Sequence, residues 1–279
     1  MPSADDDMHR ANPAPIAATE SYPAALDEVI RDIARRLWAA TDLDAGVDLL
    51  VEAGRALGLP VPSMLDDISQ ADAPMDTHGQ LLAERFGWSA AFIERWVARA
   101  YSLSNPVAIL CRFEHSPFVW MSQETPDYAV GDRETHVRTL QELASQGVYA
   151  SILVPVRTPR GRIGYIGFGG RRPREDVEAL VATHGPDLLV MGHAFLRIYL
   201  EAHGAPRAPE DCASLSPREV DCLTHVAQGH GDEDIAARLG ISKHTARFHV
   251  ENAVQKLGAT NRTHAVALAA QLGLVGPVS

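Results

Sequence analysis

Two amphipathic helical patterns open the part of the chain that we expect to fold. Between residues 24 and 40, apolar side chains recur at spacings of three and four, which is typical of one face of an α-helix. These side chains are Leu26, Val29, Ile30, Ile33, Leu37 and Trp38. A second helix, which Thr41 or Asp42 can cap, is predicted to run to Leu57 and to stop at Gly58. The pattern therefore predicts two helices before any strand.

The middle of the chain is predicted to contain a loop and further helices. Residues 59–77 contain three prolines and no stable period, so they predict a loop with at most one short edge strand. Helical periodicity returns over residues 80–86, 89–102 and 132–145, and the Asn-Pro pair at 105–106 suits a helix start. The apolar residues expected on the inward faces of these helices are Phe92, Ile93, Trp96, Val97, Ala100, Val137, Leu140 and Leu143.

Two β-rich runs follow, and they predict the centre of a sheet. Residues 151–156 (SILVPV) and 162–170 (RIGYIGFGG) are joined by a short connection with Pro and Gly, which is typical of an antiparallel hairpin. Residues 173–203 return to helix, with an interruption expected near residues 185–186 (Gly-Pro). Helices before and after a sheet predict an α/β/α sandwich.

The C-terminal part has a different organisation. Residues 202–213 are rich in Pro, Ala and Gly and predict an interdomain linker. Four short helices are expected after it, at 217–228, 232–239, 243–257 and 262–272. The turn at 240–242 contains a glycine and ends at Ser242, a good N-cap, so the second and third helices predict a helix-turn-helix. The expected fold is thus α+β: an α/β/α sandwich with a central antiparallel sheet, then an all-α four-helix module.

Composition narrows the class of protein. The 279 residues, 46% apolar and 22% charged, suit two globular domains. Residues 1–22 carry acids and prolines, so we expect a disordered leader, no secretory signal, no membrane association and a cytoplasmic protein. The three cysteines and twelve histidines lack zinc-site spacing, so no metal or cofactor is expected. The net charge of −11 disfavours general polyanion binding, so any DNA contact must be local.

The C-terminal segment resembles the LuxR-type helix-turn-helix domain throughout its length. The matching residues are Leu215, Ser216, Arg218, Glu219, Leu223, Gly229, Ile235, Ala236, Leu239, Ile241, Ser242, Thr245, His249, Asn252, Lys256, Leu257, Asn261, Arg262 and Ala265. The resemblance implies double-stranded DNA as partner, with Arg247, Phe248 and Glu251 directed into the major groove. Arginine can bind guanine, glutamate can accept from cytosine, and phenylalanine can contact a thymine methyl. Lys243 and Thr245 suit phosphates, and His244 lies beside them.

Charge in this module works against strong DNA binding. From Asp211 onward, six Lys/Arg face seven Asp/Glu, which gives a net charge of −1. The acidic run at 232–234 also lies at the start of the predicted second helix, where the helix dipole favours it. We therefore expect modest affinity from a single copy, with dimerisation or neighbouring proteins supplying the rest.

Residues 24–200 resemble the autoinducer-binding domain of LuxR-type quorum-sensing receptors. The resemblance rests on three segments: AFIERWVARAYSLSNPV, SPFVW and QGVYASILVPVRTPRGRIGYIGF. It implies a site for an N-acyl homoserine lactone between the sheet and one helix layer. In that site Trp120 would pack on the lactone ring, with Tyr101 nearby. Asn105 replaces an aspartate that accepts the ligand amide N–H in relatives, although Asn105 equally suits a helix N-cap.

The implied pocket departs from the family pattern at further positions. Ser151 stands where relatives have a glycine, and Leu153 where they often have Thr or Ser. The segment PVPSMLDDIS has no counterpart of the Trp and Tyr donors that relatives place on an early strand. The loss of donors weakens a ligand that needs them. Three alternatives stay open: a different ligand, a lactone held in another way, or no ligand.

The functional expectation is a homodimeric, cytoplasmic LuxR-type transcription regulator that senses a small molecule. We expect a sensor and dimerisation domain at 23–201, the linker at 202–213 and the DNA-binding domain at 214–279. The helix at 173–203 and the last helix would form the dimer surfaces, the operator would be an inverted repeat, and RNA polymerase is a candidate partner. The alternative is a ligand-independent regulator or an anti-activator that pairs with another LuxR-type receptor. No nucleophile elbow, metal set or phosphate loop indicates an enzyme.

Overall fold

The computed structural model describes residues 24–70, 72–98, 106–122, 133–158, 161–204 and 215–276. The predicted leader, most of the predicted linker, Tyr101 and Asn105 lie outside these residues. Within them, no helix is both long enough and apolar enough to cross a membrane.

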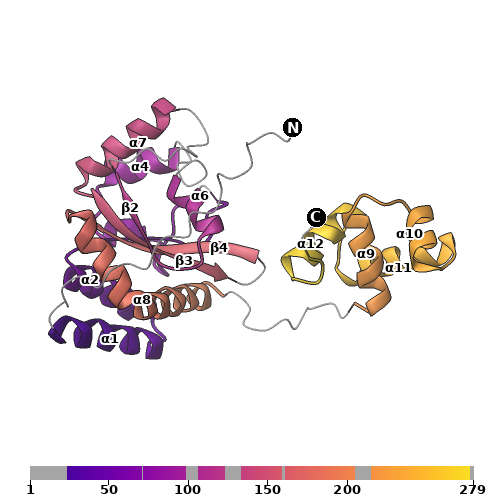
Figure 1. Cartoon of the computed structure of the whole chain (residues 1–279), viewed down its shortest axis with the longest axis horizontal. Coiled ribbons are helices and arrows are strands. Elements are labelled where there is room, and N and C mark those ends of the chain that lie inside the picture. Colours follow the sequence, from indigo (N-terminus) through magenta and orange to yellow (C-terminus); the bar gives the residue numbers. More distant parts are fainter. Residues whose placement is uncertain are drawn as a thin grey trace, which may run out of the picture.

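A four-stranded antiparallel sheet lies at the centre of the N-terminal part (Figure 1). Its strands are β1 (Val61–Leu65), β2 (Phe118–Met121), β3 (Ala150–Thr158) and β4 (Arg162–Gly170), in the order β1-β4-β3-β2. The predicted hairpin of β3 and β4 therefore forms the two central strands. The single short strand expected in the proline-rich segment is β1, and it lies at an edge as predicted.

Side chains of the central hairpin alternate between two cores, because successive residues of a strand point to opposite faces. On β3, Ile152 and Val154 belong to the core on one face, whereas Leu153 belongs to the core on the other. On β4, Phe168 and Tyr165 divide in the same way. Both faces of the sheet are therefore covered, which is why the runs SILVPV and RIGYIGFGG are so apolar.

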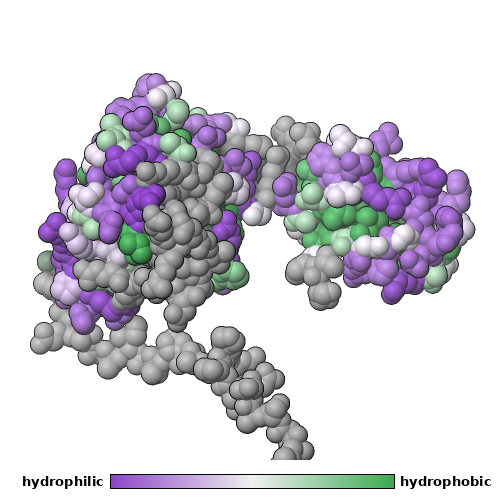
Figure 2. Space-filling view, turned by 90° about the horizontal axis from the view of Figure 1, so that it is seen from above, coloured by the Kyte–Doolittle hydropathy of each residue, from purple (hydrophilic) through white to green (hydrophobic). Residues whose placement is uncertain are grey.

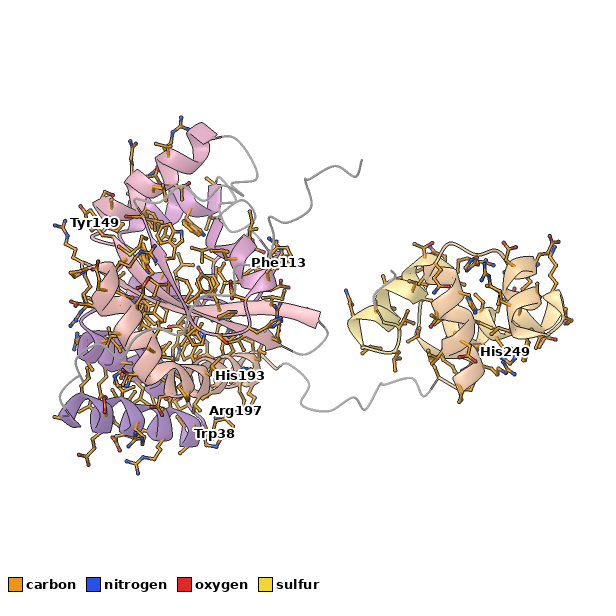
Figure 3. The ribbon with its side chains drawn as sticks, in the orientation of Figure 1. Trp38, Phe113, Tyr149, His193, Arg197 and His249 are labelled. Atoms are coloured by element: carbon orange, nitrogen blue, oxygen red, sulfur yellow. The ribbon has the colours of Figure 1, made fainter. Side chains whose placement is uncertain are left out.

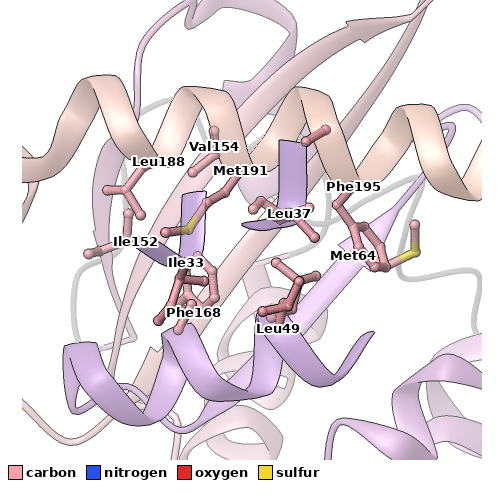
Figure 4. Close-up of a cluster of buried hydrophobic side chains, with 14 of the residues drawn as sticks. Ile33, Leu37, Leu49, Met64, Ile152, Val154, Phe168, Leu188, Met191 and Phe195 are labelled. Atoms are coloured by element: carbon pink, nitrogen blue, oxygen red, sulfur yellow. The ribbon is translucent and has the colours of Figure 1, made fainter. Parts of the chain in front are cut away.

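One face is covered by α1 (Ala24–Ala39), α2 (Leu43–Leu57) and α8 (Arg174–Ala202) (Figure 1). Figure 4 shows their side chains interlocking with those of the sheet. As predicted, Asp42 caps α2 by accepting from the backbone N–H of Ala45 at 2.9 Å, and Gly58 ends the helix with φ +67°. The residues of this core that Figure 4 labels are Ile33, Leu37, Leu49, Met64, Ile152, Val154, Phe168, Leu188, Met191 and Phe195.

The predicted interruption of the last sensor helix is wrong. α8 runs for 29 residues without a break, with Pro186 inside it. Proline removes one backbone hydrogen bond, but α8 buries apolar side chains on both sides of Pro186, with Leu180 before it and Leu188 after it. Continuous packing on the sheet and α1 therefore outweighs the local cost.

Four residues predicted to face inward are exposed. Val29 and Trp38 on α1 are 43% and 60% exposed, Val97 on α4 (Ala90–Ala98) is 36% exposed, and Val137 on α7 (Arg133–Ser145) is 38% exposed. The buried face of α1 is narrower than the face predicted from its apolar residues, because only one side of the helix packs against α2 and α8. Arg197 of α8 donates to the carbonyl oxygen of Trp38 at 2.9 Å, and Figure 3 shows both residues on the outer side.

The other face of the sheet is covered by shorter helices. These are α3 (Leu82–Arg85), α4 (Ala90–Ala98), α6 (Pro106–Phe113) and α7. α3 is shorter than predicted, and residues 99–102 of the helix predicted at 89–102 lie outside the described residues. α6 begins at Pro106, as expected. Their buried side chains form a second core with the sheet, which includes Phe92, Ile93, Val107, Leu140, Leu143 and Tyr165.

Residues 215–276 form a helical module of α9 (Pro217–Ala227), α10 (Asp232–Leu239), α11 (Lys243–Lys256) and α12 (Arg262–Gln271). All four predicted helices are present. Gly240 ends α10 with φ +65°, and Ser242 caps α11 by accepting from the backbone N–H of Thr245 at 3.0 Å. Figure 2 shows apolar side chains gathered in one area of this module, with hydrophilic surface around them.

A buried histidine gives the sensor domain a pH dependence. His184 of α8 is 1% exposed, and burial lowers its pKa even though Asp27 of α1, whose Oδ1 lies 3.7 Å from Nε2, raises it. Asp187 also raises this pKa, and Arg31 lowers it. The unfolded chain therefore takes up this proton at a higher pH than the folded chain, so stability is lost as pH falls below about 6.5.

We predict that His184→Gln flattens the decline of the unfolding free energy between pH 7 and pH 5. The matched control is His193→Gln, because His193 is an exposed residue of the same helix (Figure 3). Urea unfolding across this pH range measures both variants. Equal slopes for the His184 variant and the unmodified chain would contradict the assignment.

Candidate functional site

An apolar cavity lies between the sheet and the layer of short helices. The space inside it that the centre of a water molecule can occupy has a volume of about 90 Å³. Its floor is the sheet face that carries Leu153 and Tyr165, and its walls come from α3, α4, α6, α7 and the segment between β1 and α3. The lining residues are Val61, Ser63, Met64, Leu65, Ala73, Pro74, Leu82, Ala83, Phe86, Trp88, Phe92, Ile93, Trp96, Val107, Trp120, Leu143, Val148, Ser151, Leu153, Tyr165 and Gly169.

Three of the five ligand-site residues predicted from sequence line this cavity. They are Trp120, Ser151 and Leu153. Strand register places Trp120 of β2 directly opposite Ser151 of β3. Trp120 is 5% exposed, and within the described part of the chain no group accepts a hydrogen bond from its Nε1. The predicted roles of Tyr101 and Asn105 stay predictions, since both lie outside the described residues.

An aromatic wall, made of Trp88, Phe92 and Trp96, closes one side of the cavity. The rings of Trp88 and Phe92 stack at 4.8 Å, and those of Phe92 and Trp96 lie 5.5 Å apart. Trp88 Nε1 donates to the carbonyl oxygen of Pro62 at 2.7 Å, which ties the wall to β1. These three residues were not among the ligand-site residues predicted from the sequence, although aromatic residues at spacings of four are a signal that could have found them.

The chemistry of the cavity is that of a neutral site. Burial raises the pKa of Tyr165 far above its usual range, so its hydroxyl stays protonated. Burial also raises the pKa of the neighbouring Cys111 thiol to about 12, so it stays unreactive. The arrangement suits binding of an uncharged, largely apolar molecule.

The recognition helix α11 presents most of its predicted DNA contacts to solvent. Lys243, His244, Arg247, Phe248 and Glu251 are exposed, and Thr245 is half-buried. Phe248 is 53% exposed. The opposite face of α11 packs through Ala246, Val250 and Ala253 into the module core.

Acidic residues neutralise the basic side chains near this helix. Arg247 Nε lies 2.8 Å from Glu251 Oε1, and Lys243 Nζ is in close contact with Glu233 Oε1 on α10. The hydrogen bonds to Glu251 and Glu233 raise the pKa of Arg247 and of Lys243, respectively. DNA must therefore compete with carboxylates for both cations. The sequence predicted the acidic balance of the module but not these pairs.

A buried carboxylate joins α9 to α11. Glu219 is 3% exposed, accepts from the backbone N–H of Ser216 at 2.7 Å and from Lys256 Nζ at 2.8 Å. Burial alone would raise its pKa, but the bonds from Lys256 and Ser216 outweigh burial, so the pKa is lowered. Glu219 therefore stays ionised and fixes the orientation of the recognition helix.

Two family models match the chain. Residues 66–198 match the autoinducer binding domain, and residues 213–269 match the model described as bacterial regulatory proteins, luxR family. The quorum sensing-dependent regulator RpaR of Rhodopseudomonas palustris is 31% identical over 68% of this chain and 73% of its own length. The chain belongs to the luxR family of bacterial regulatory proteins. It is thus an autoinducer-binding, helix-turn-helix transcription regulator, as predicted.

Other luxR-family similarities agree with this assignment. The HTH-type protein y4qH of Sinorhizobium fredii is 31% identical over 68% of this chain, which spans about half (54%) of that protein. SdiA of Escherichia coli has the same fold, with a TM-score of 0.52 and 16% identity over 89% of this chain and 98% of SdiA. A second SdiA structure, solved with octanoyl-rac-glycerol, has a TM-score of 0.53 and 14% identity over 92% of this chain and all of that one.

We predict that Glu219→Gln loosens the DNA-binding module of this luxR-family regulator. The amide can still accept from Ser216, but it loses the charge-assisted bond from Lys256, which is worth about 1.5 to 3 kcal/mol. Hydrogen exchange of α9 and α11 amides in the full chain measures the effect, and faster exchange is expected. Glu233→Gln is the control, because its carboxylate is exposed. Equal exchange in both variants would contradict the role of Glu219.

Proposed function

We propose that the regulator binds an uncharged acyl compound in the cavity and that Trp120 Nε1 donates a hydrogen bond to a carbonyl oxygen of this ligand. The observation that carries the proposal is a buried indole N–H that lines an apolar cavity and has no acceptor among the described residues. A buried donor without an acceptor costs about 1 to 3 kcal/mol, so a ligand carbonyl at this position is favoured. The aromatic wall would enclose the acyl chain.

Two of the three ligand alternatives agree with this proposal: a ligand other than a lactone, and a lactone held in another way. The structure of SdiA with octanoyl-rac-glycerol favours a ligand other than a lactone. That compound is an acyl ester without a lactone ring, and SdiA has the same fold as this chain. A homoserine lactone held through Trp120, without the donors that relatives use, is the other form of the proposal. Ser151 and Leu153 would contact the ligand from the floor, and Tyr101 and Asn105 from segments outside the described residues.

A contact between the cavity wall and the end of α8 supplies a route from ligand to DNA-binding module. Ala73 and Pro74 line the cavity. The backbone of Met75, the residue that follows Pro74, forms a hydrogen bond with the Tyr199 hydroxyl. Tyr199 is buried near the C-terminus of α8, and the ring of His203 packs on it at 4.3 Å. A ligand that orders this wall would hold the end of α8, from which the linker at 202–213 leads to the DNA-binding domain at 214–279.

DNA recognition would follow the family arrangement in a homodimer. Exposed residues of α8 and the small apolar side chains of α12, such as Ala267 and Ala270, are the proposed dimer surfaces. A two-fold dimer would bind an inverted repeat with half-sites about 10 bp apart. Arg247, Phe248 and Glu251 would contact bases, and Lys243, His244 and Thr245 the backbone. RNA polymerase is a proposed partner of the DNA-bound dimer.

We predict that octanoyl-rac-glycerol or N-octanoyl homoserine lactone raises the thermal stability of the full chain. Ligand at a hundred times its Kd stabilises the folded state by about 2.7 kcal/mol. Trp120→Phe keeps an aromatic ring but removes the N–H, so it should weaken binding roughly three- to tenfold. Calorimetric titration measures the Kd of each variant.

The matched control for this experiment is Trp38→Phe. Trp38 is 60% exposed on the outer side of α1, far from the cavity (Figure 3). Its replacement should leave the Kd unchanged. Equal affinities of the Trp120 and Trp38 variants would refute the hydrogen bond, and a folded chain that binds neither compound would refute an acyl ligand.

We predict that Arg247→Ala lowers the preference of the full chain for its selected operator over random DNA about ten- to hundredfold. The operator is first selected from a randomised library with the unmodified chain. Arg218→Ala on α9 is the control, since Arg218 is also exposed and pairs with Asp221 at 3.7 Å. Fluorescence anisotropy measures both affinities. If the unmodified chain selects no DNA, the pairing of Lys243 and Arg247 with carboxylates would instead favour the anti-activator that acts through another LuxR-type receptor.

A further inference from the structure

Two serine hydroxyls lie above glycines of β4 on the cavity side of the sheet. A Cβ on Gly167 would lie 2.6 Å from Ser63 Oγ, and a Cβ on Gly169 would lie 3.3 Å from Ser151 Oγ. Strand register pairs Ser63 of β1 with Gly167, and Ser151 of β3 with Gly169. The hydroxyls therefore reach over the same strand from its two sides, because glycine leaves the space above β4 open.

A third hydroxyl extends this row. Tyr165 precedes Gly167 by two residues on β4, so its side chain leaves the same face of the sheet. It is 6% exposed, and its hydroxyl hydrogen-bonds Ser63. We call Ser151, Ser63 and Tyr165 the hydroxyl row. All three line the cavity, whose other lining side chains are almost entirely apolar.

The hydroxyl row extends along β4 from a position beside Trp120, so the distance between its polar positions can be derived from the strand. Ser151 pairs with Trp120 across β2 and β3. Gly169 and Gly167 are two residues apart, so the hydroxyls above them are roughly 7 Å apart at about 3.3 Å of rise per residue. Trp120 and Ser151 thus form one polar position, and Ser63 with Tyr165 forms a second position about 7 Å away along β4.

We propose that the hydroxyl row selects an acyl ligand with a second oxygen function about 7 Å from the carbonyl that Trp120 binds. This inference rests on the proposed function and names the class of ligand. A serine hydroxyl has one donor and two acceptor positions, and the bond between Ser63 and Tyr165 leaves further capacity on both oxygens. A hydrocarbon chain that covers the Ser63 and Tyr165 hydroxyls excludes water and leaves the hydrogen bonds to that water unreplaced. A hydroxyl or carbonyl group of the ligand would replace these hydrogen bonds.

The test uses N-octanoyl homoserine lactone and its 3-hydroxy and 7-hydroxy analogues as probes, with calorimetric titration of the full chain. The 7-hydroxy analogue places its oxygen near the second polar position, so it should bind about tenfold more tightly than the unsubstituted probe. The 3-hydroxy analogue places its oxygen short of that position and should gain little. Tyr165→Phe and Ser63→Ala, alone and combined, should abolish the tenfold preference while the unsubstituted probe binds as before or more tightly.

Tyr149→Phe is the matched control. The Tyr149 hydroxyl accepts a hydrogen bond from Arg171 Nη2 at 3.3 Å, and Tyr149 does not line the cavity. Its replacement should leave the preference for the 7-hydroxy analogue intact. Equal affinity for all three probes would overturn the hydroxyl row alone. Binding of no probe by a folded chain would overturn the acyl ligand and the row together. If Tyr165→Phe does not fold, Ser63→Ala alone decides.

Discussion

The structure depends on the alternation of side chains along the β3–β4 hairpin, which places one apolar row on each face of the sheet. On one face, Ile152, Val154 and Phe168 meet the long helices α2 and α8 in a buried apolar core. On the other face, Leu153 and Tyr165 meet short helices that leave a cavity. The same strands therefore support a rigid core and a binding site.

Charge balance sets the character of the DNA-binding module. Glu219 is ionised and buried, so it stabilises the position of α11 through Lys256. Glu233 and Glu251 are exposed and instead pair with Lys243 and Arg247, the cations that we propose contact DNA. Exposed ion pairs contribute little to stability, so these carboxylates chiefly lower the charge that α11 offers to phosphates. In the homodimer that we propose, two recognition helices would compensate for weak single contacts.

Local patterns in the sequence predicted the elements well, because they depend on residues close together. The hairpin, the caps at Asp42 and Ser242, and all four C-terminal helices were found in this way. The break at Pro186 was wrong because tertiary packing outweighs a local penalty. The hydroxyl row could not be predicted from local patterns, because it depends on the strand register that brings Ser63 of β1 and Tyr165 of β4 together. The residues of the aromatic wall are spaced four apart in the sequence, which places them on one side of a helical segment, but only the fold shows that this side faces the cavity.

The proposed ligand contact is the hydrogen bond that the Trp120 indole N–H donates in the cavity. It is measured most directly in the ¹H–¹⁵N spectrum of the four tryptophan indoles of the full chain, titrated with octanoyl-rac-glycerol. The resonance missing in Trp120→Phe identifies Trp120. We expect this resonance to shift in proportion to the bound fraction while that of Trp38 stays in place. A saturating ligand that leaves the Trp120 resonance unchanged would contradict this hydrogen bond.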